Sequence, residues 1–247
     1  MIVNALLRGR SLSQFKNLGD CDLVILANDT DQEIQTIDGL KEYLIDKEIN
    51  LVENMVATGA IGYHKMNFFN DYNVTKLIRP YLNGIRKPGS SGQNIPLKDN
   101  FLGDNHKEFM FGDGKVSKKY EYDYPGTGIA AIAYAVLDCK PDVLNIVGLD
   151  FYDNLFYDES NYLIKSSPHT HTHGYSIEGL TKNNHNELRR YQRLMQEVLC
   201  KLAERNPNVQ VNLITKCKSF ISKVKTLKNL KIENCDKKNL VFFDKNL

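Results

Sequence analysis

The chain has 247 residues, of which 42% are hydrophobic, and a formal net charge of +2 at neutral pH. A chain of this length and hydrophobic content can bury a full core, which excludes a linker or tail, and its balanced charge excludes nucleic-acid binding driven by overall charge. The five cysteines form no Cys-x-x-Cys pair, so neither a zinc knuckle nor a disulfide framework is indicated, and a reducing compartment is expected. No apolar run approaches the roughly 18 residues of a membrane span. We therefore expect a cytoplasmic protein.

Strands and helices alternate from the start of the chain. The apolar run Ile2 to Leu7 predicts a strand, and the amphipathic residues 12–18 predict a helix after a tight turn. A second apolar run, 23–27, predicts a buried strand. A helix around residues 38–46 and a short strand at 51–52 follow.

The second half is less regular at first. Residues 79–111 are interrupted by Pro and Gly, which predicts loops and one short strand at 109–111. Residues 153–184, rich in Asn, Asp, Tyr and His, break the alternation again, and so long a segment without a periodic pattern is typical of a functional loop or of disorder. The other predicted elements are a small-residue helix at 129–137, a strand from Val143, a long helix at 187–205, a strand at 209–214 and a Lys-rich tail.

This alternation predicts an α/β fold, a single Rossmann-like, doubly wound and mainly parallel sheet with loops over its carboxyl edge. We expect the nucleotide-binding domain to comprise residues 1–152 and 186–220, and 153–185 to form a lid-like insertion. Residues 221–247 form the basic C-terminal tail. Residues 216–238 are rich in Lys with interspersed Leu, Ile and Phe, which indicates a solvated surface, a patch that contacts a membrane or an acidic acceptor, or a contact with nucleic acid.

The strongest functional signal lies between Tyr124 and Tyr152. Gly126-Thr127-Gly128 opens the small-residue helix, and the strand that follows ends in Gly148-Leu149-Asp150. Free N–H groups at a helix N-terminus bind anions, and the carboxyl ends of parallel strands carry polar groups to one edge of the sheet. This pattern predicts a nucleotide site that includes Thr127, Gly128 and Asp150.

Polar residues also follow the other predicted strands. Arg8-Gly9-Arg10-Ser11 comes directly after the first strand. Such a loop is most often an ordinary turn, although its two arginines can hold a carboxylate or phosphate. Ser11 is also placed to cap the next helix. Asn28 and Asn54 each follow a strand, either as turn residues or as part of a polar rim that contacts a base or ribose.

Candidates for acid–base chemistry lie on both sides of the insertion. The hydroxyls of Tyr152 and Tyr157 can donate to a leaving phosphate without a metal, or their rings can simply pack the loop. His185 precedes the long helix and is a candidate general base; His173, five residues before Glu178, competes with it. Residues 169–173 include three histidines with no nearby thiolate or carboxylate, so no metal site is expected.

Together these residues resemble the bacterial sialyltransferases of glycosyltransferase family 42, which use CMP-N-acetylneuraminic acid. The resemblance spans most of residues 1–220 and implies a GT-A-like variant of the Rossmann fold with metal-independent, inverting transfer of sialic acid to a glycan hydroxyl. It implies that the nucleotide is bound by Asn28, Asn54, Thr127 and Gly128, that Tyr152 and Tyr157 donate to its phosphate, and that His185 or His173 is the base. The matching motifs are Gly9-Arg10-Ser11-Leu12, Asn28, Thr127-Gly128 and Gly148-Leu149-Asp150-Phe151-Tyr152.

The chain departs from the family in its first loop, where Arg8-Gly9-Arg10 replaces the usual Gly-Asn-Gly, and in lacking an Arg before Thr127-Gly128. A related CMP-activated acidic sugar is therefore an alternative donor. Two other functions remain open on the same scaffold. One is magnesium-dependent phosphate or pyrophosphate transfer with Asp29 and Asp150 as the acidic pair, and the other is nucleotide binding without catalysis.

The resemblance also implies partners. We expect a CMP-sugar donor, a glycan acceptor that includes lipid-linked forms, and no resident cofactor, metal or nucleic acid. The family favours a homo-oligomer with peripheral contact to the inner face of the membrane through a basic surface.

Overall fold

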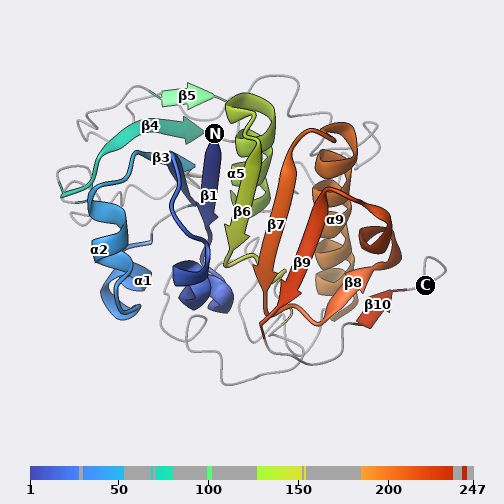
Figure 1. Ribbon diagram of the computed structural model, residues 1–247. Coiled ribbons are helices and arrows are strands. Elements are labelled where there is room, and N and C mark those ends of the chain that lie inside the picture. The colour runs from blue at the N-terminus through green and yellow to red at the C-terminus, as the bar shows by residue number, and fades with distance from the viewer. Residues whose placement is uncertain are drawn as a thin grey trace.

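The computed structural model describes residues 1–27, 30–52, 68, 71–79, 99–101, 127–151, 153, 185–235 and 241–243. At its centre is an eight-stranded sheet in the order β5-β4-β3-β2-β1-β6-β7-β9, in which every neighbouring pair is parallel (Figure 1). The predicted α/β class with a mainly parallel sheet is confirmed. The strands are β1 (Ile2–Leu6), β2 (Leu23–Ala27), β3 (Ile49–Val52), β4 (Val74–Arg79), β5 (Asp99–Phe101), β6 (Val143–Val147), β7 (Gln210–Thr215) and β9 (Leu230–Asn234).

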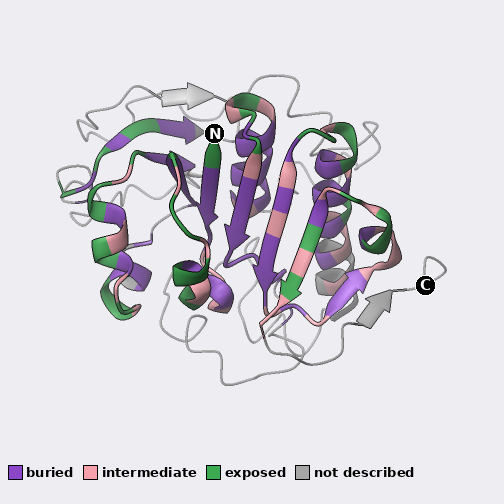
Figure 2. Cartoon of the chain, viewed as in Figure 1, coloured by how far each residue is buried: buried purple, intermediate pink, exposed green. Residues whose placement is uncertain are grey.

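Helices cover both faces of this sheet. Successive strand residues point to opposite faces, so Ala5 and Leu6 of β1 belong to two separate apolar clusters. Figure 2 shows β1 and β6 buried along most of their length, as expected for strands covered on both sides. One face carries α5 (Thr127–Tyr134), its π-helical continuation (Ala135–Cys139) and α9 (His185–Arg205), and the other carries the 3-10 helix η1 (Arg10–Asn17), α1 (Asp31–Thr36) and α2 (Leu40–Ile45).

The strand order reverses at β1. The chain adds β2, β3, β4 and β5 on one side of β1 and then places β6, β7 and β9 on its other side. In open parallel sheets, ligands bind outside the carboxyl ends of the two strands at which the order reverses. The carboxyl ends of β1 and β6 are therefore the first place to look for a site.

Some elements differ from the sequence predictions. The predicted helix at 12–18 is the 3-10 helix η1, and its N-cap is Gly9, so the expected capping role of Ser11 is wrong. Helix α1 and strands β4 and β5 were not predicted, because these short, partly polar segments show no clear period. The predicted strand at 109–111 lies outside the described residues, as does the insertion 153–185 apart from Asp153 and the backbone of His185.

The expected basic tail contributes to the fold. Its residues 230–234 form β9 at the edge of the sheet, which extends the sheet domain beyond the expected boundary at residue 220. The tail also contains the 3-10 helix η3 (Ser222–Thr226) and β10 (Val241–Phe243), which pairs in parallel with β8 (Ser219–Ile221). Across the described ranges, no helix is long and apolar enough to cross a membrane.

Candidate functional site

Hydrogen bonds join the segment after β1 to the segment after β6. The Gly9 amide donates to the Gly148 carbonyl at 2.7 Å, and the Gly148 amide donates to Ser11 Oγ at 2.8 Å. Gly148 has a φ of +78°, and a Cβ there would lie 1.9 Å from the carbonyl oxygen of Leu7. A Cβ on Gly9 would lie 2.4 Å from the Gly148 carbonyl oxygen. These two positions therefore require glycine, and two of the predicted motifs lie in direct contact.

Asp150 connects this pair to the end of β7. It is 5% exposed, and its Oδ2 accepts a hydrogen bond from the Ser11 amide at 2.8 Å. Its Oδ1 accepts from the Lys216 amide at 2.8 Å and from Thr215 Oγ1 at 3.0 Å. The carboxylate thus holds together the segments that follow β1, β6 and β7. Its predicted contact with a nucleotide stays a prediction.

Replacing Asp150 by asparagine is expected to lower the free energy of unfolding by about 2–4 kcal/mol. The substitution removes the charge from these hydrogen bonds and turns an amide NH₂ toward a backbone N–H donor. Urea denaturation measures the change. Asp38→Asn is the control, because Asp38 forms a solvent-exposed ion pair with Lys16, and such pairs contribute at most about 1 kcal/mol. Equal losses in the two variants would contradict the connecting role of Asp150.

The start of α5 lies against the same segments. Thr127 is buried, and a Cβ added to Gly128 would lie 3.2 Å from Leu7 Cδ1 and 3.8 Å from Leu149 Cδ1. The first turn of α5 therefore packs on the residues that follow β1 and β6. The structure brings together the first loop, the Thr-Gly turn and the Gly-x-Asp motif, although they are far apart in the sequence.

Arg8 of the first loop contacts a residue that carries no sequence motif. Its Nε donates to Glu33 Oε1 at 2.9 Å, and the two side chains are 24% and 1% exposed respectively. Glu33 belongs to α1, which follows the carboxyl end of β2. The one signal in the sequence is an acidic residue shortly after the second strand, the position that contacts ribose in many dinucleotide-binding sheets. Arg10 is half-buried at the start of η1.

A turn follows Asp150. The Asp153 amide donates to the Asp150 carbonyl at 2.9 Å, and between them Phe151 is buried and has a φ of +51°, which is rare for a residue with a Cβ. The ring of Phe151 packs edge-on against Phe220, with 5.9 Å between the ring centroids. Tyr152 lies outside the described residues. The residues on both sides of Tyr152 are thus fixed by packing and hydrogen bonds.

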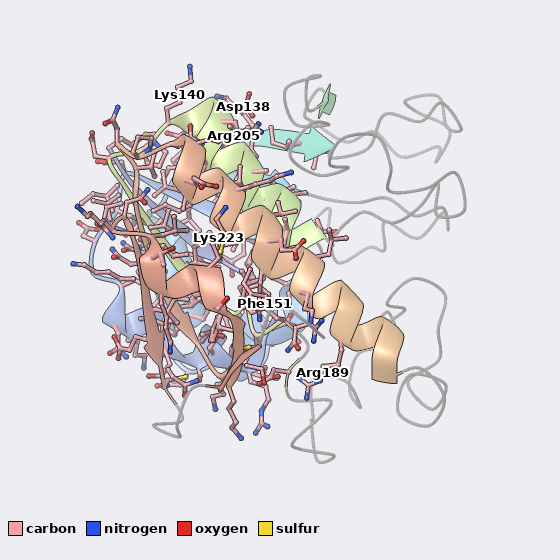
Figure 3. All side chains as sticks on the ribbon, turned by 90° about the vertical axis from the view of Figure 1, so that its right-hand side faces the viewer. Asp138, Lys140, Phe151, Arg189, Arg205 and Lys223 are labelled. Carbon is pink, nitrogen blue, oxygen red and sulfur yellow. The ribbon has the colours of Figure 1, made fainter. Side chains whose placement is uncertain are left out.

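Asp153 connects the turn to α9. Its Oδ1 accepts from Gln192 Nε2 at 2.8 Å and lies 3.5 Å from Arg189 Nη1. Burial raises the pKa of Asp153, while hydrogen bonds from the Lys218 amide and Gln192, together with the charge of Arg189, act in the opposite direction. Figure 3 shows Phe151 and Arg189 toward one end of the molecule, with Asp138, Lys140 and Arg205 toward the other. The N-terminal half of α9 is therefore attached to the carboxyl edge of the sheet.

His185 is the first residue of α9, two positions earlier than the predicted start of that helix. The backbone of His185 thus begins the helix whose fifth residue, Arg189, contacts Asp153. Its side chain lies outside the described part of the chain, as do the predicted site residues His173, Tyr152, Tyr157, Asn28 and Asn54. Among the side chains that the structure describes, no group of three or more His, Cys, Asp or Glu residues is placed to hold a metal ion.

Groups of both charges lie at this edge. Arg8 and Arg10 follow β1 and the N-terminus of α5, the positive end of its dipole, lies at the same edge, whereas Glu33 is paired with Arg8 and the carboxylate of Asp150 accepts hydrogen bonds there. Arg10 and the start of α5 would attract an anion placed at the carboxyl ends of β1 and β6. Comparison of the chain with known protein families, with curated proteins and with solved structures finds no match.

Proposed function

We propose that the chain is a metal-independent, inverting glycosyltransferase of the sialyltransferase type. It transfers sialic acid or a related acidic sugar from a CMP-activated donor to a glycan hydroxyl. The observation that supports this most is the meeting of three motifs at one edge: Gly9-Arg10-Ser11, Thr127-Gly128 and Gly148-Leu149-Asp150. The reversal of strand order at β1, typical of Rossmann-like sheets, supports a nucleotide at that edge.

In this proposal the nucleotide lies across the carboxyl ends of β1 and β6. The N–H groups at Thr127 and Gly128 contact the nucleotide phosphate, and Asn28 and Asn54 contact the cytidine. Arg8 or Arg10 adds positive charge beside the donor, whose phosphate and sugar carboxylate are both anionic. The residues 153–185 close over the donor as the expected lid.

The chemical step needs a base and a way to stabilise the leaving group. His185 or His173 takes the proton of the acceptor hydroxyl while its oxygen attacks the anomeric carbon from the face opposite the CMP. The bond from that carbon to the phosphate oxygen breaks, and the electron pair leaves with CMP. Tyr152 and Tyr157 donate hydrogen bonds to the charge that develops on the phosphate. The products are the new glycoside, CMP and a proton that the base returns to water.

The acceptor is a glycan, lipid-linked forms included, and the enzyme is a homo-oligomer that contacts the inner face of the membrane peripherally. Lys216 and Lys218 follow β7 at the same edge as the site, which supports an anionic surface or acceptor near that edge.

Ligand-induced thermal stabilisation tests the proposed function. At a CMP concentration one hundred times its Kd, binding to the native state stabilises it by about 2.7 kcal/mol. For a domain of this size we expect Tm to rise by roughly 5–10 °C, equally with magnesium and with EDTA. CDP, UDP, ADP, GDP and NAD are the comparison ligands. A shift that needs magnesium and another nucleotide would contradict the proposal and favour phosphate transfer. CMP binding without donor hydrolysis or transfer would indicate a catalytically inactive binding protein.

A further inference from the structure

Among the described residues, one carboxylate oxygen of Glu33 is buried without a hydrogen-bond partner. The side chain is 1% exposed and its Oε1 accepts from Arg8 Nε at 2.9 Å. Its Oε2 is buried and has no hydrogen-bond partner in the part of the chain that the structure describes. Buried polar atoms are nearly always paired, because an unpaired one keeps the full cost of its lost hydration. Such an oxygen can accept a hydrogen bond from a donor that the described residues do not supply, such as a bound ligand.

The position of Glu33 indicates where that donor comes from. Glu33 lies on α1, which follows β2, and its partner Arg8 directly follows β1, the neighbour of β2 in the sheet. The ion pair therefore lies at the carboxyl edge, beside the first loop that contacts Gly148 and Asp150. The Arg8–Glu33 pair would therefore lie on the β2 side of a ligand bound at the carboxyl ends of β1 and β6.

The charge of Glu33 restricts the chemistry of the partner. A phosphate or sugar carboxylate would be repelled by the carboxylate, whereas a neutral hydroxyl can donate to it. In a nucleotide, the ribose hydroxyls are donors of this kind. In other nucleotide-binding parallel sheets, an acidic residue just beyond the second strand accepts a hydrogen bond from the ribose.

We propose that Glu33 Oε2 accepts a hydrogen bond from a ribose hydroxyl of the bound nucleotide, and that Arg8 holds the carboxylate in place for this contact. The inference rests on the proposed nucleotide site but assigns a specific role to a residue within it. The site thereby distinguishes ribonucleotides from deoxyribonucleotides.

Titration calorimetry of CMP, 2′-deoxy-CMP and 3′-deoxy-CMP tests the inference. A hydrogen bond to a charged group predicts that one of the two deoxynucleotides binds the natural chain about ten- to a hundredfold more weakly than CMP. The variant Glu33→Met should bind that deoxynucleotide and CMP with nearly equal affinity. Glu33→Met leaves Arg8 without this partner. The double variant Arg8→Met with Glu33→Met is therefore measured as well, because replacing both members of a buried pair preserves folding better than replacing one.

The ratio of the two affinities is the readout, so a general loss of affinity in the variants does not affect the result. Glu42→Met, on the exposed surface of α2, is the matched control and should keep the ratio of the natural chain. Equal binding of all three nucleotides by the natural chain would overturn the inference while leaving the proposed function intact. A ratio that persists in both Glu33 variants would assign the ribose contact to another residue. Absence of CMP binding would overturn the inference and the proposed function together.

Discussion

Replacing Gly148 by alanine is expected to remove most of the folding stability of the chain. A left-handed backbone costs a residue with a Cβ about 1–2 kcal/mol. The larger effect is steric, because the new Cβ would lie 1.9 Å from the Leu7 carbonyl oxygen and 2.4 Å from its carbonyl carbon. The Leu7 backbone cannot move aside freely, since its amide donates to the Val147 carbonyl at 2.8 Å. We expect a total loss above about 4 kcal/mol, out of the 5–15 kcal/mol typical of a native domain.

Gly19 provides the matched control for this substitution. Its φ of +74° is close to that of Gly148, but a Cβ at Gly19 meets no atom within 4 Å. Gly19→Ala should therefore cost only the backbone strain, about 1–2 kcal/mol. Denaturant unfolding of both variants, followed by circular dichroism, separates the cost of the left-handed backbone from the cost of the steric clash with Leu7. Similar losses in the two variants would mean that the segments after β1 and β6 are not in contact as described.

The strands that the sequence predicts correctly are the central ones. β1, β2 and β6 are buried along most of their length on both faces, so their residues are mainly apolar, and in β7 the run from Leu213 to Thr215 is buried in the same way. Strand β9 was missed because it lies at the edge of the sheet and alternates Leu230 and Ile232 with exposed Lys231 and Glu233. In a Lys-rich segment, that alternation is easily taken for a solvated tail. Sequence composition alone cannot show that a neighbouring strand is present to pair with it.

The candidate site was predictable only where its residues directly follow strands or open a helix. Gly9, Gly148 and Asp150 stand in such positions, and the structure brings them together. The partner of Ser11 was not predictable, because its hydroxyl accepts from the amide of a residue 137 positions away. The same holds for Glu33, whose importance depends on one ion pair and one unsatisfied oxygen. Local patterns thus identify the elements of the site, whereas the hydrogen bonds between them depend on the tertiary fold.

Replacing His185 by alanine is expected to lower kcat for sugar transfer by about two to four orders of magnitude, with CMP affinity nearly unchanged. The start of α9 is held at the carboxyl edge, because Arg189, one turn further along the helix, lies 3.5 Å from Asp153 at the end of the β6 turn. A general base must be unprotonated to take the proton of the acceptor hydroxyl. Single-turnover transfer from the CMP-sugar measures the effect.

The dependence of kcat/KM on pH separates a base from a structural residue. If His185 is the base, the fall in rate at acidic pH disappears in His185→Ala, because the group whose protonation caused it is gone. A residue that only starts the helix would lower Tm and leave the shape of the pH profile unchanged. Asn186→Ala, at the next position of α9, controls for disturbance of the helix start and should keep both rate and profile. If His173→Ala rather than His185→Ala loses turnover and the fall in rate at acidic pH, His173 is the base. Near-native turnover in both histidine variants would contradict base catalysis by either residue.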